Sequence, residues 1–338
     1  MNSGPVDVVL GGATGMVGRA MIRVLEERNF PVHRLFPMAS ARSAGKSVTF
    51  RGEQVKVEEL TAETIRASGA QVALFSAGAT VSRQFAPVAV NAGMLVIDNS
   101  SAFRMDAEVP LIVPEVNPHA IMQHNGIIAN PNCSTIQLVV ALKPLHDRFS
   151  VKRIVVATYQ SVTGGGQRGY DQLMHELSGR TAPVPKFPHP IAYNVIPHID
   201  EFLEDGYTRE ERKIMEETRK ILGDSSLRIV ATCVRVPVVG AHSEAVTVEF
   251  ERPFALEDVR SILQGAPGVI VVDDPPRAYP MPVTAKDRDE VFVGRLRRDP
   301  SAENSLSLWI VADNIRKGAA TNAVQIAEEW LKTRDCQY

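Results

Sequence analysis

The chain has 338 residues and a formal net charge of −2, with 44% hydrophobic and 22% charged residues. This composition indicates a globular protein of about two domains and argues against a disordered chain. No basic excess points to nucleic acid or to an anionic membrane surface, and the apolar runs are far shorter than the roughly 18 residues of a membrane-spanning helix. The N-terminus lacks the basic segment of a secretory signal, so we expect a cytoplasmic protein.

The three cysteines, Cys133, Cys233 and Cys336, are odd in number and far apart, which excludes a disulfide framework. No cysteine or histidine cluster has the spacing of a zinc site, so we expect no bound metal. Cys233 lies inside an apolar strand pattern and is expected in the core. Cys336 lies in a polar tail and is expected to be an incidental surface thiol.

Short apolar runs alternate with helical patterns through the first third of the chain. We expect buried strands at residues 6–11, 32–36, 72–75, 94–98 and 126–130, and helices at 16–28, 60–68 and 82–92. Strands that alternate with helices require parallel crossovers. This part of the chain therefore predicts a Rossmann-like, doubly wound parallel sheet.

The pattern changes after Pro131, where longer and often alternating strands follow one another with fewer helices. We expect strands at residues 151–160, 227–237, 245–250, 269–273, 291–296 and 306–312. Such patterning favours an α+β domain with a mostly antiparallel sheet. Five prolines between residues 178 and 198 predict a long ordered loop, and residues 315–334 predict an amphipathic helix. The fold class is α/β with two domains.

A glycine-rich turn joins the first strand to the first helix. Gly12, Gly15 and Gly18 are spaced so that the turn can tighten and backbone N–H groups can approach a pyrophosphate at the helix N-terminus. A glycine pattern alone is weak, and a turn that binds nothing is the alternative. Its position between the first strand and the first helix favours a dinucleotide site.

The end of the second strand indicates which dinucleotide is bound. No acidic residue lies between residues 28 and 52, where an NAD site usually has one on the ribose hydroxyls. Ser40, Arg42 and Ser43 would suit the 2′-phosphate of NADP through one guanidinium and two hydroxyl donors. A solvated polar loop is the alternative, and Lys46 would be able to share the task.

Cys133 follows a strand and begins a helix, in the segment PNCSTIQ at residues 131–137. The N–H groups and dipole at a helix N-terminus stabilise a thiolate, and they would also hold a substrate oxyanion. A buried cysteine at a helix cap is the alternative. A thiolate beside a nicotinamide indicates acyl transfer to sulfur followed by hydride transfer.

Two further side chains suit this chemistry. His242 follows a Pro/Gly turn and would exchange a proton with Cys133 or its adduct, although a plain loop histidine is the alternative. Arg235 would bind a carboxylate through two hydrogen bonds. Residues 208–211 predict a capping box that opens a helix, which places Glu210 and Lys213 on one face. A cation beside an anion suits a zwitterionic substrate that carries phosphate, with a surface ion pair as the alternative.

Taken together, several segments in this order resemble the bacterial aspartate-semialdehyde dehydrogenase family over essentially the whole chain. They are GATGMVG at 12–18, NSSAFRM at 99–105, PNCSTIQ at 131–137, TYQ at 158–160, NVIPHID at 194–200, RVPVVGAHSE at 235–244 and DNIRKGAA at 313–320. The second domain departs slightly, with Thr163-Gly-Gly-Gly166 where the family has Ser-Gly-Ala-Gly and Ala312 where it has Gly.

The resemblance implies reductive dephosphorylation of L-4-aspartyl phosphate to L-aspartate 4-semialdehyde by NADPH through a cysteine thioester. This step leads to lysine (through diaminopimelate), methionine, threonine and isoleucine. It implies that Cys133 is the nucleophile, that His242 is the acid/base and that Gln160 orients the acyl group. It further implies that Arg235 binds the substrate carboxylate, Glu210 its amino group, and Arg104, Asn132 and Lys213 the phosphate.

The resemblance also implies an NADP site and a homodimer formed through the second domain. The cofactor-binding residues would be Gly12, Thr14, Gly15, Met16, Val17, Gly18, Ser40, Arg42, Ser43, Ser76, Gly78, Ser161, Gly164, Gly165 and Asn322. Residues 1–132 would form the NADP-binding domain, completed by a helix at 315–338, and residues 133–314 the catalytic and dimerisation domain. The alternatives are an N-acetyl-γ-glutamyl-phosphate reductase and a non-catalytic paralogue. Cys133 and His242 argue against the paralogue, and Glu210 argues for a free amino group.

Overall fold

The computed structural model describes residues 4–335, so the tail with Cys336 lies outside the described residues. The chain divides into two compact units. Unit 1 spans Met1–Pro131 and Ala319–Tyr338, and unit 2 spans Asn132–Gly318. Within residues 4–335, no helix is both long enough and apolar enough to cross a membrane.

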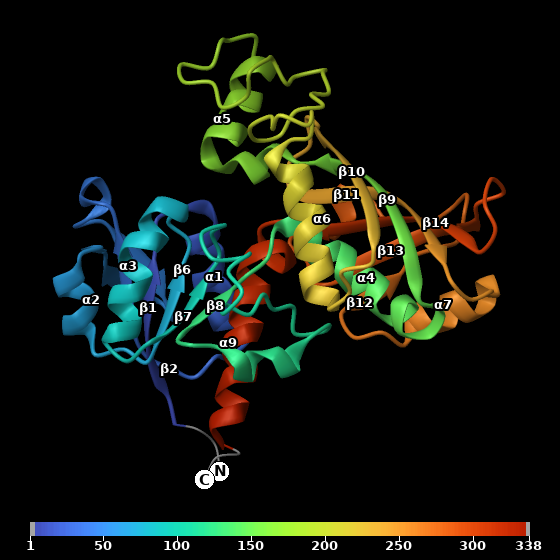
Figure 1. Ribbon diagram of the computed structural model, residues 1–338. Coiled ribbons are helices and arrows are strands. Elements are labelled where there is room, and N and C mark those ends of the chain that lie inside the picture. The colour runs from blue at the N-terminus through green and yellow to red at the C-terminus, as the bar shows by residue number, and fades with distance from the viewer. Residues whose placement is uncertain (1–3, 336–338) are drawn as a thin grey trace. The chain divides into compact units, whose positions relative to one another are not determined.

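Unit 1 is built around a six-stranded sheet in the order β5-β2-β1-β6-β7-β8 (Figure 1). The strands are β1 (Val6–Gly11), β2 (Val32–Ala39), β5 (Glu58–Glu59), β6 (Val72–Phe75), β7 (Leu95–Asp98) and β8 (Ile127–Ala129). All pairings are parallel. The chain winds outward in both directions from β1 and β6, which confirms the doubly wound sheet and makes the carboxyl ends of these two strands the expected place for a ligand.

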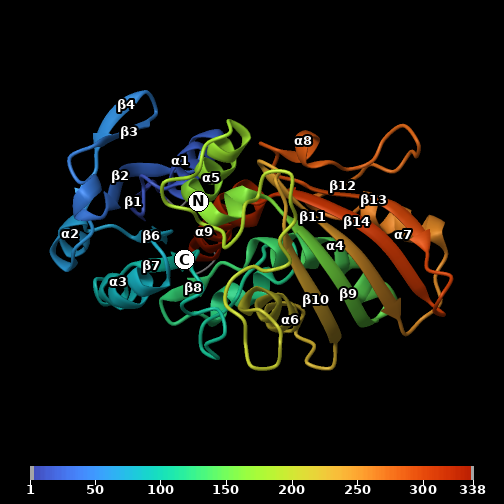
Figure 2. The ribbon, with the colours of Figure 1, turned by 90° about the horizontal axis from the view of Figure 1, so that it is seen from above.

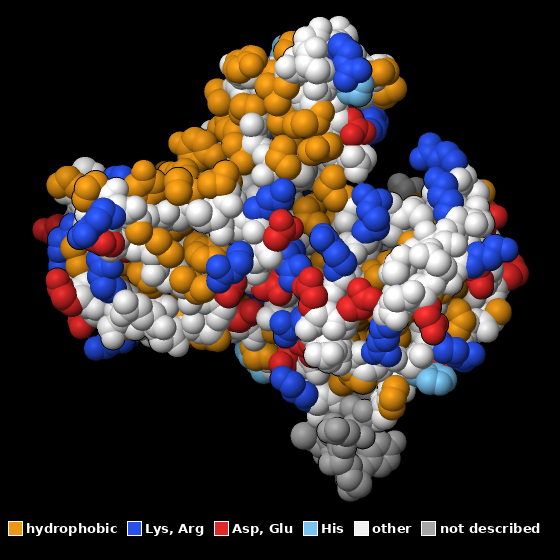
Figure 3. Space-filling model, turned by 180° about the vertical axis from the view of Figure 1, so that it is seen from behind, with side chains coloured by type: hydrophobic (Ala, Val, Ile, Leu, Met, Phe, Trp, Pro, Cys, Tyr) orange, Lys and Arg blue, Asp and Glu red, His pale blue; other side chains and the backbone are white. Residues whose placement is uncertain are grey.

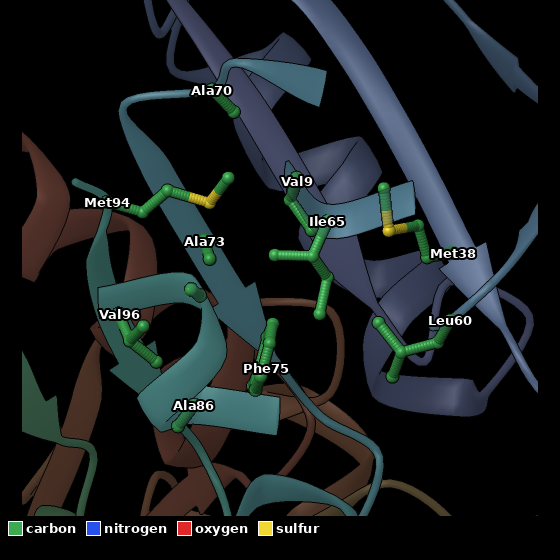
Figure 4. Close-up of a cluster of buried hydrophobic side chains, with 11 residues drawn as sticks. Val9, Met38, Leu60, Ile65, Ala70, Ala73, Phe75, Ala86, Met94 and Val96 are labelled. Carbon is green, nitrogen blue, oxygen red and sulfur yellow. The ribbon is translucent and has the colours of Figure 1, made fainter. Parts of the chain in front are cut away.

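Helices cover this sheet because its strands are apolar on both faces. They are α1 (Met16–Glu27), α2 (Ala62–Ser68), α3 (Ala79–Asn91) and α9 (Thr321–Asp335), with short turns η1 (Ala41–Ser43) and η2 (Pro118–Gln123). Figure 4 shows Ile65 of α2 and Ala86 of α3 in a fully buried cluster with Val9 and Phe75. This packing holds β1 and β6 rigidly beneath the glycine turn.

Two features of unit 1 differ from expectation. A hairpin of β3 (Ser47–Phe50) and β4 (Glu53–Lys56) was not predicted, because its strands are short and mostly exposed and so lack an apolar pattern. The last helix does not begin at residue 315, since a π-helical turn at Arg316–Ala320 precedes α9. Helix α9 packs against α1, and Arg28 pairs with Glu328 at 2.6 Å.

Unit 2 contains a six-stranded sheet in the order β10-β9-β11-β14-β13-β12 (Figure 2). The strands are β9 (Val151–Gln160), β10 (Arg228–Arg235), β11 (Ala241–Phe250), β12 (Val269–Val271), β13 (Val291–Arg298) and β14 (Ser305–Asp313). The three central pairings are antiparallel, as expected, but both edge strands pair in parallel. The sheet is therefore mixed.

The helices of unit 2 are α4 (Cys133–Phe149), α5 (Gly166–Leu177), α6 (Arg209–Leu222), α7 (Leu256–Gln264) and α8 (Pro282–Ala285), with a short turn η3 (Val162–Gly165). Helix α4 packs on the central strands. Figure 1 shows α5 and the segment after it as an excursion at one end of the sheet. Helix α5 was not predicted, because it is polar and begins in a run of glycines that have low helix propensity.

Candidate active site

The side chains of unit 2 that the sequence predicts for catalysis or substrate binding are described from the N-terminus of α4 outward. The helix begins at Cys133, which confirms the predicted position of this thiol. The side-chain Oδ1 of Asn132 accepts hydrogen bonds from the backbone N–H groups of Ser134 and Thr135, at 3.0 and 3.3 Å. A Cβ on Gly318 would lie 2.9 Å from the Cβ of Cys133, so only glycine leaves room for the half-buried thiol.

Glu210 is the centre of a buried hydrogen-bond network. Its Oε1 accepts hydrogen bonds from the Nδ2 of Asn132 at 2.8 Å and from the Nε2 of Gln160 at 3.1 Å. Its Oε2 pairs with Lys213 at 3.2 Å. Although burial raises the pKa of Glu210, the charge of Lys213 and these hydrogen bonds outweigh it and hold the pKa below its usual value. A carboxylate therefore stays charged inside the protein.

Helix α6 carries Glu210 and Lys213 in its first turns. It begins with the predicted capping box, which the structure confirms. Thr208 accepts a hydrogen bond from the backbone of Glu211, and Glu211 accepts one from the backbone of Thr208. Lys213 also pairs with Asp200 at 2.6 Å. Burial lowers the pKa of Lys213, but the two carboxylates raise it more, so the amine remains charged.

His242 is fully buried, and one nitrogen of its ring is fixed by the backbone. The N–H of Ser161 donates to the Nδ1 of His242 at 2.9 Å. A neutral imidazole that accepts at Nδ1 carries its proton on Nε2, and Nε2 has no hydrogen-bond partner among the described residues. Burial and the charge of Arg235 lower the pKa of His242 well below its usual value, so the ring is neutral at physiological pH.

Arg235 is the buried cation of the site. Its Nη1 donates to the backbone oxygen of Ser161 at 2.6 Å, while its Nε has no hydrogen-bond partner within the described structure. Burial lowers the pKa of Arg235, and the charges of Glu210 and Cys133 raise it. Arg235 therefore interacts electrostatically with both Glu210 and Cys133.

The other described thiol is part of the core, as predicted. Cys233 is completely buried, and burial together with the charge of Glu210 raises its pKa far above the usual range. It therefore stays a neutral thiol with no role as a nucleophile.

The glycine turn of unit 1 has the geometry of a phosphate-binding loop. Gly12 has a φ of +85°, and a Cβ there would lie 2.4 Å from the oxygen of Ser76. A Cβ on Gly18 would lie 2.2 Å from the oxygen of Gly12. Helix α1 begins at Met16, and no side chain caps its first turn, so the N–H groups of Met16, Val17 and Gly18 face a possible anion.

Residues after β2 and β6 flank this turn. Ser40 and Arg42 are exposed beyond β2, and the Oγ of Ser43 accepts a hydrogen bond from the Oγ1 of Thr14 at 3.3 Å. Ser76, beyond β6, donates its backbone N–H to Gly11 at 2.9 Å. The other predicted residue here, Gly78, caps α3 at a φ of +91°. Predicted groups for both ends of a dinucleotide therefore lie along one edge of this sheet.

Other predicted residues have structural partners. In unit 1, the Nδ2 of Asn322 donates to the backbone oxygen of Ile112 at 2.9 Å and to the Oδ1 of Asn130 at 2.7 Å, which fixes α9. Arg104 is buried and donates to the backbone oxygen of Asn99 at 3.1 Å.

In unit 2, the Oγ of Ser161 donates to the backbone oxygen of Val238 at 2.8 Å, besides the contact of its N–H with His242. A Cβ on Gly164 would lie 2.7 Å from Arg235 and 3.1 Å from His242, so this glycine forms the floor between them. Gly165 lies against the ring of Phe187, with a Cβ there at 3.2 Å. Phe187 carries no sequence signal of function, yet the guanidinium of Arg235 lies over its ring.

The glycine turn on a doubly wound sheet, together with a thiol at a helix N-terminus in the second unit, is typical of an NAD(P)-binding dehydrogenase. Residues 7–124 match the family model "Semialdehyde dehydrogenase, NAD binding domain", and residues 142–317 match "Semialdehyde dehydrogenase, dimerisation domain".

Comparison with individual proteins narrows this class. The chain is 54% identical to aspartate-semialdehyde dehydrogenase of Aquifex aeolicus, over 96% of this chain and 98% of that protein. It resembles the structure of aspartate semialdehyde dehydrogenase II of Vibrio cholerae complexed with ASA, with a TM-score of 0.93, 47% identity, and coverage of 98% and 99% of the two chains. It also resembles the Candida albicans enzyme with NADP, with a TM-score of 0.76, 26% identity, and coverage of 96% and 98%. The chain belongs to the aspartate-semialdehyde dehydrogenase family.

Proposed function

We propose that this protein reduces L-4-aspartyl phosphate to L-aspartate 4-semialdehyde and phosphate with NADPH, reversibly, through a thioester on Cys133. The observation that carries the proposal is the position of Cys133 at the N-terminus of α4, directly after Asn132, which donates to the same carboxylate oxygen of Glu210 as Gln160 does. Arg235 interacts electrostatically with both Glu210 and Cys133. The names of the relatives support the same reaction.

Charge complementarity supports the choice of substrate. Arg235 would bind the α-carboxylate through its unsatisfied edge, and the buried carboxylate of Glu210 would bind the α-amino group. Gln160, which donates to Glu210, would hold the acyl group beside Cys133. Lys213 and Asn132 would contact the phosphate. Lys213 would do so while it remains paired with Asp200 and Glu210.

The proposed reaction balances without proton transfer to or from any side chain. The thiolate of Cys133 attacks C4 of the acyl phosphate, a C–S bond forms, and phosphate leaves with the electron pair of the C–O bond. Hydride addition to the thioester carbon gives an alkoxide, which collapses to the aldehyde and releases the thiolate. The N–H groups of α4 and the Nε2–H of His242 would donate to that oxygen throughout.

The role of His242 follows from its tautomer. A neutral ring with its proton on Nε2 donates a hydrogen bond to the acyl oxygen without protonation of the ring. The resemblance implies that His242 is the acid/base. For that role Nδ1 must carry a proton, so the hydrogen bond from the N–H of Ser161 to Nδ1 would have to break. We therefore propose hydrogen-bond donation as the resting function of His242.

The residues of unit 1 fit NADP, which supplies the hydride when it is bound. A Cβ at Gly12 or Gly18 would overlap the backbone of Ser76 or Gly12, so the tight turn that a pyrophosphate site needs is possible only with glycine at these positions. Arg42 and Ser40 are exposed beyond β2, where a 2′-phosphate would lie, and no acidic side chain stands between residues 28 and 52.

We expect Arg42→Ala to raise KM for NADP about tenfold and to leave KM for NAD unchanged.

The test is an assay at the absorbance of reduced nicotinamide with aspartate semialdehyde and phosphate, run in parallel with NADP and NAD. N-acetylglutamate semialdehyde serves as the competing substrate. We expect faster turnover of aspartate semialdehyde with NADP. Faster reaction of the acetylated compound would make the protein an N-acetyl-γ-glutamyl-phosphate reductase instead.

We further propose a homodimer through the sheet face of unit 2 opposite α4. A cavity of about 610 Å³ lies on that face, lined in part by Val155, Tyr279, Met281 and Trp309. Figure 3 shows hydrophobic side chains gathered on the same unit. The match to a dimerisation domain over residues 142–317 supports a second copy as the occupant. Trp309→Glu should give a monomer by light scattering, whereas Glu257→Lys on the exposed side of α7 should not.

A further inference from the structure

The proline-rich segment at residues 183–192 is held in one conformation by two side chains of α5. The Oε1 of Gln172 accepts hydrogen bonds from the backbone N–H groups of residues 186 and 187, at 2.7 and 2.8 Å. The Oε2 of Glu176 accepts from residues 191 and 192, at 2.7 and 2.8 Å. The Nε2 of Gln172 donates to Glu176 at 2.8 Å, which joins the two acceptors into a single clamp.

This clamp fixes the position of the ring of Phe187. One side of the ring packs on glycines, since a Cβ on Gly165 or Gly169 would lie 3.2 or 2.9 Å from it. The guanidinium of Arg235 lies over the ring, with its central carbon 5.4 Å from the ring centroid. The aromatic ring is therefore in contact with these glycines and with a buried cation.

The chain just beyond this segment holds the backbone of Arg235. Ile196 and Arg235 exchange two hydrogen bonds, with the N–H of Ile196 at 2.9 Å and the N–H of Arg235 at 2.8 Å from the other residue's oxygen. Arg235 thus has a fixed backbone, one hydrogen bond from Nη1 to Ser161, and an aromatic ring against its guanidinium. Its Nε has no partner in the described structure and remains available.

We propose that Phe187 is a positioning residue for substrate recognition, since it orients the guanidinium of Arg235 toward the α-carboxylate. The inference rests on the proposed role of Arg235 in carboxylate binding. A guanidinium that is attracted to the face of a fixed ring has fewer orientations open to it, so less conformational freedom is lost when a carboxylate binds. Aspartate semialdehyde should therefore bind more tightly because of a side chain that does not touch it.

Phe187→Leu removes the aromatic face and keeps an apolar side chain. We expect KM for aspartate semialdehyde to rise roughly 3- to 30-fold, while kcat and the KM values for phosphate and NADP stay within about twofold. Phe187→Tyr retains the ring and should match the wild type. Val184→Ala, at an exposed position of the same segment, should also match it.

A substrate without the α-carboxylate separates this role from a merely structural one. With 3-aminopropanal and phosphate, Phe187→Leu and the wild type should have equal kcat/KM. An equal loss with both aldehydes would overturn the proposal, because the ring would then act on the whole site. An unchanged KM for aspartate semialdehyde would overturn it as well.

Arg235→Lys tests the underlying function separately. It should raise KM for aspartate semialdehyde but not for 3-aminopropanal. If Arg235→Lys has this effect and Phe187→Leu does not, the proposed function stands and the role of Phe187 falls. If Arg235→Lys lacks the effect, the carboxylate assignment itself is wrong. Should Phe187→Leu fail to fold, Gln172→Met, which removes the acceptor for residues 186 and 187, must give the same KM pattern.

Discussion

The glycine turn of unit 1 and the thiol site of unit 2 solve the same problem, recognition of a charged ligand, with different parts of the chain. The turn uses backbone N–H groups and the absence of Cβ atoms at Gly12 and Gly18. The thiol site uses buried charged side chains from different elements. Glu210 of α6 accepts hydrogen bonds from Asn132 and Gln160, and Arg235 of β10 donates one to the backbone oxygen of Ser161. A backbone site depends on local geometry, whereas a side-chain site depends on the packing of the whole unit.

The comparison has a consequence for stability. Burial of backbone N–H groups at a helix N-terminus requires no ionised group inside the protein. Burial of Glu210, Lys213 and Arg235 requires mutual neutralisation, because each alone would be strongly desolvated. We therefore expect the two sites to respond differently to substitution.

The largest effect should come from Cys133→Ser. A hydroxyl at this position cannot ionise as a thiol does, so turnover should fall by at least about a thousandfold. NADP binding, which we assign to unit 1, should be unchanged in a fluorescence titration. Activity near that of the wild type would contradict the thioester mechanism.

His242 distinguishes hydrogen-bond donation from proton transfer. His242→Leu should lower kcat by about 10²- to 10³-fold, the usual loss for one donor to an oxyanion. His242→Gln keeps an N–H donor and should retain roughly ten times more activity than the leucine variant. Equal inactivity of the two variants would mean that a proton must pass through the ring. Single-turnover reduction of the acyl phosphate provides the measurement.

The two sites also differ in how far the sequence predicts them. The glycine turn, the helix start at Cys133 and the capping box of α6 are encoded within a few consecutive residues, and the structure confirms all three. The contact of Ser161 with His242 spans 81 residues and depends on strand register, which no local pattern encodes. The ring of Phe187 lies in a proline-rich segment whose conformation is set by α5, a helix that the sequence did not predict.

Gly12→Ala tests whether the unit 1 site is built from backbone. A methyl group would lie 2.4 Å from the oxygen of Ser76, so β1 and β6 would have to separate where the pyrophosphate is expected. We expect the dissociation constant of NADP to rise at least about tenfold. Gly45→Ala is the matched control, because Gly45 shares the positive φ but has nothing within 4 Å of its Cβ position. Equal losses in the two variants would assign the effect to backbone strain alone.

The remaining prediction concerns the stability of the side-chain site rather than turnover or ligand affinity. Glu244 lies in β11, two residues after His242, and it is fully buried without a hydrogen-bond partner in the described structure. Burial raises its pKa well above the usual value, a shift that Gln137 of α4 opposes. The folded protein therefore keeps a proton that the unfolded chain releases once the pH exceeds about 4.3.

Because the folded pKa is the higher one, Glu244 destabilises the native state progressively as pH rises above that value. The free energy of unfolding should fall by up to about 1.4 kcal/mol per pH unit from this group, until pH reaches the folded pKa. Glu244→Gln removes this dependence, so the variant should gain stability over the wild type as pH increases from 4 to 7 in urea unfolding, roughly in proportion to pH. Glu251→Gln, at an exposed position beyond β11, should show no such trend. If the difference in unfolding free energy between Glu244→Gln and the wild type stays constant with pH, Glu244 is ionised in the folded protein. Unit 2 would then hold a further buried charge that has no hydrogen-bond partner in the described structure.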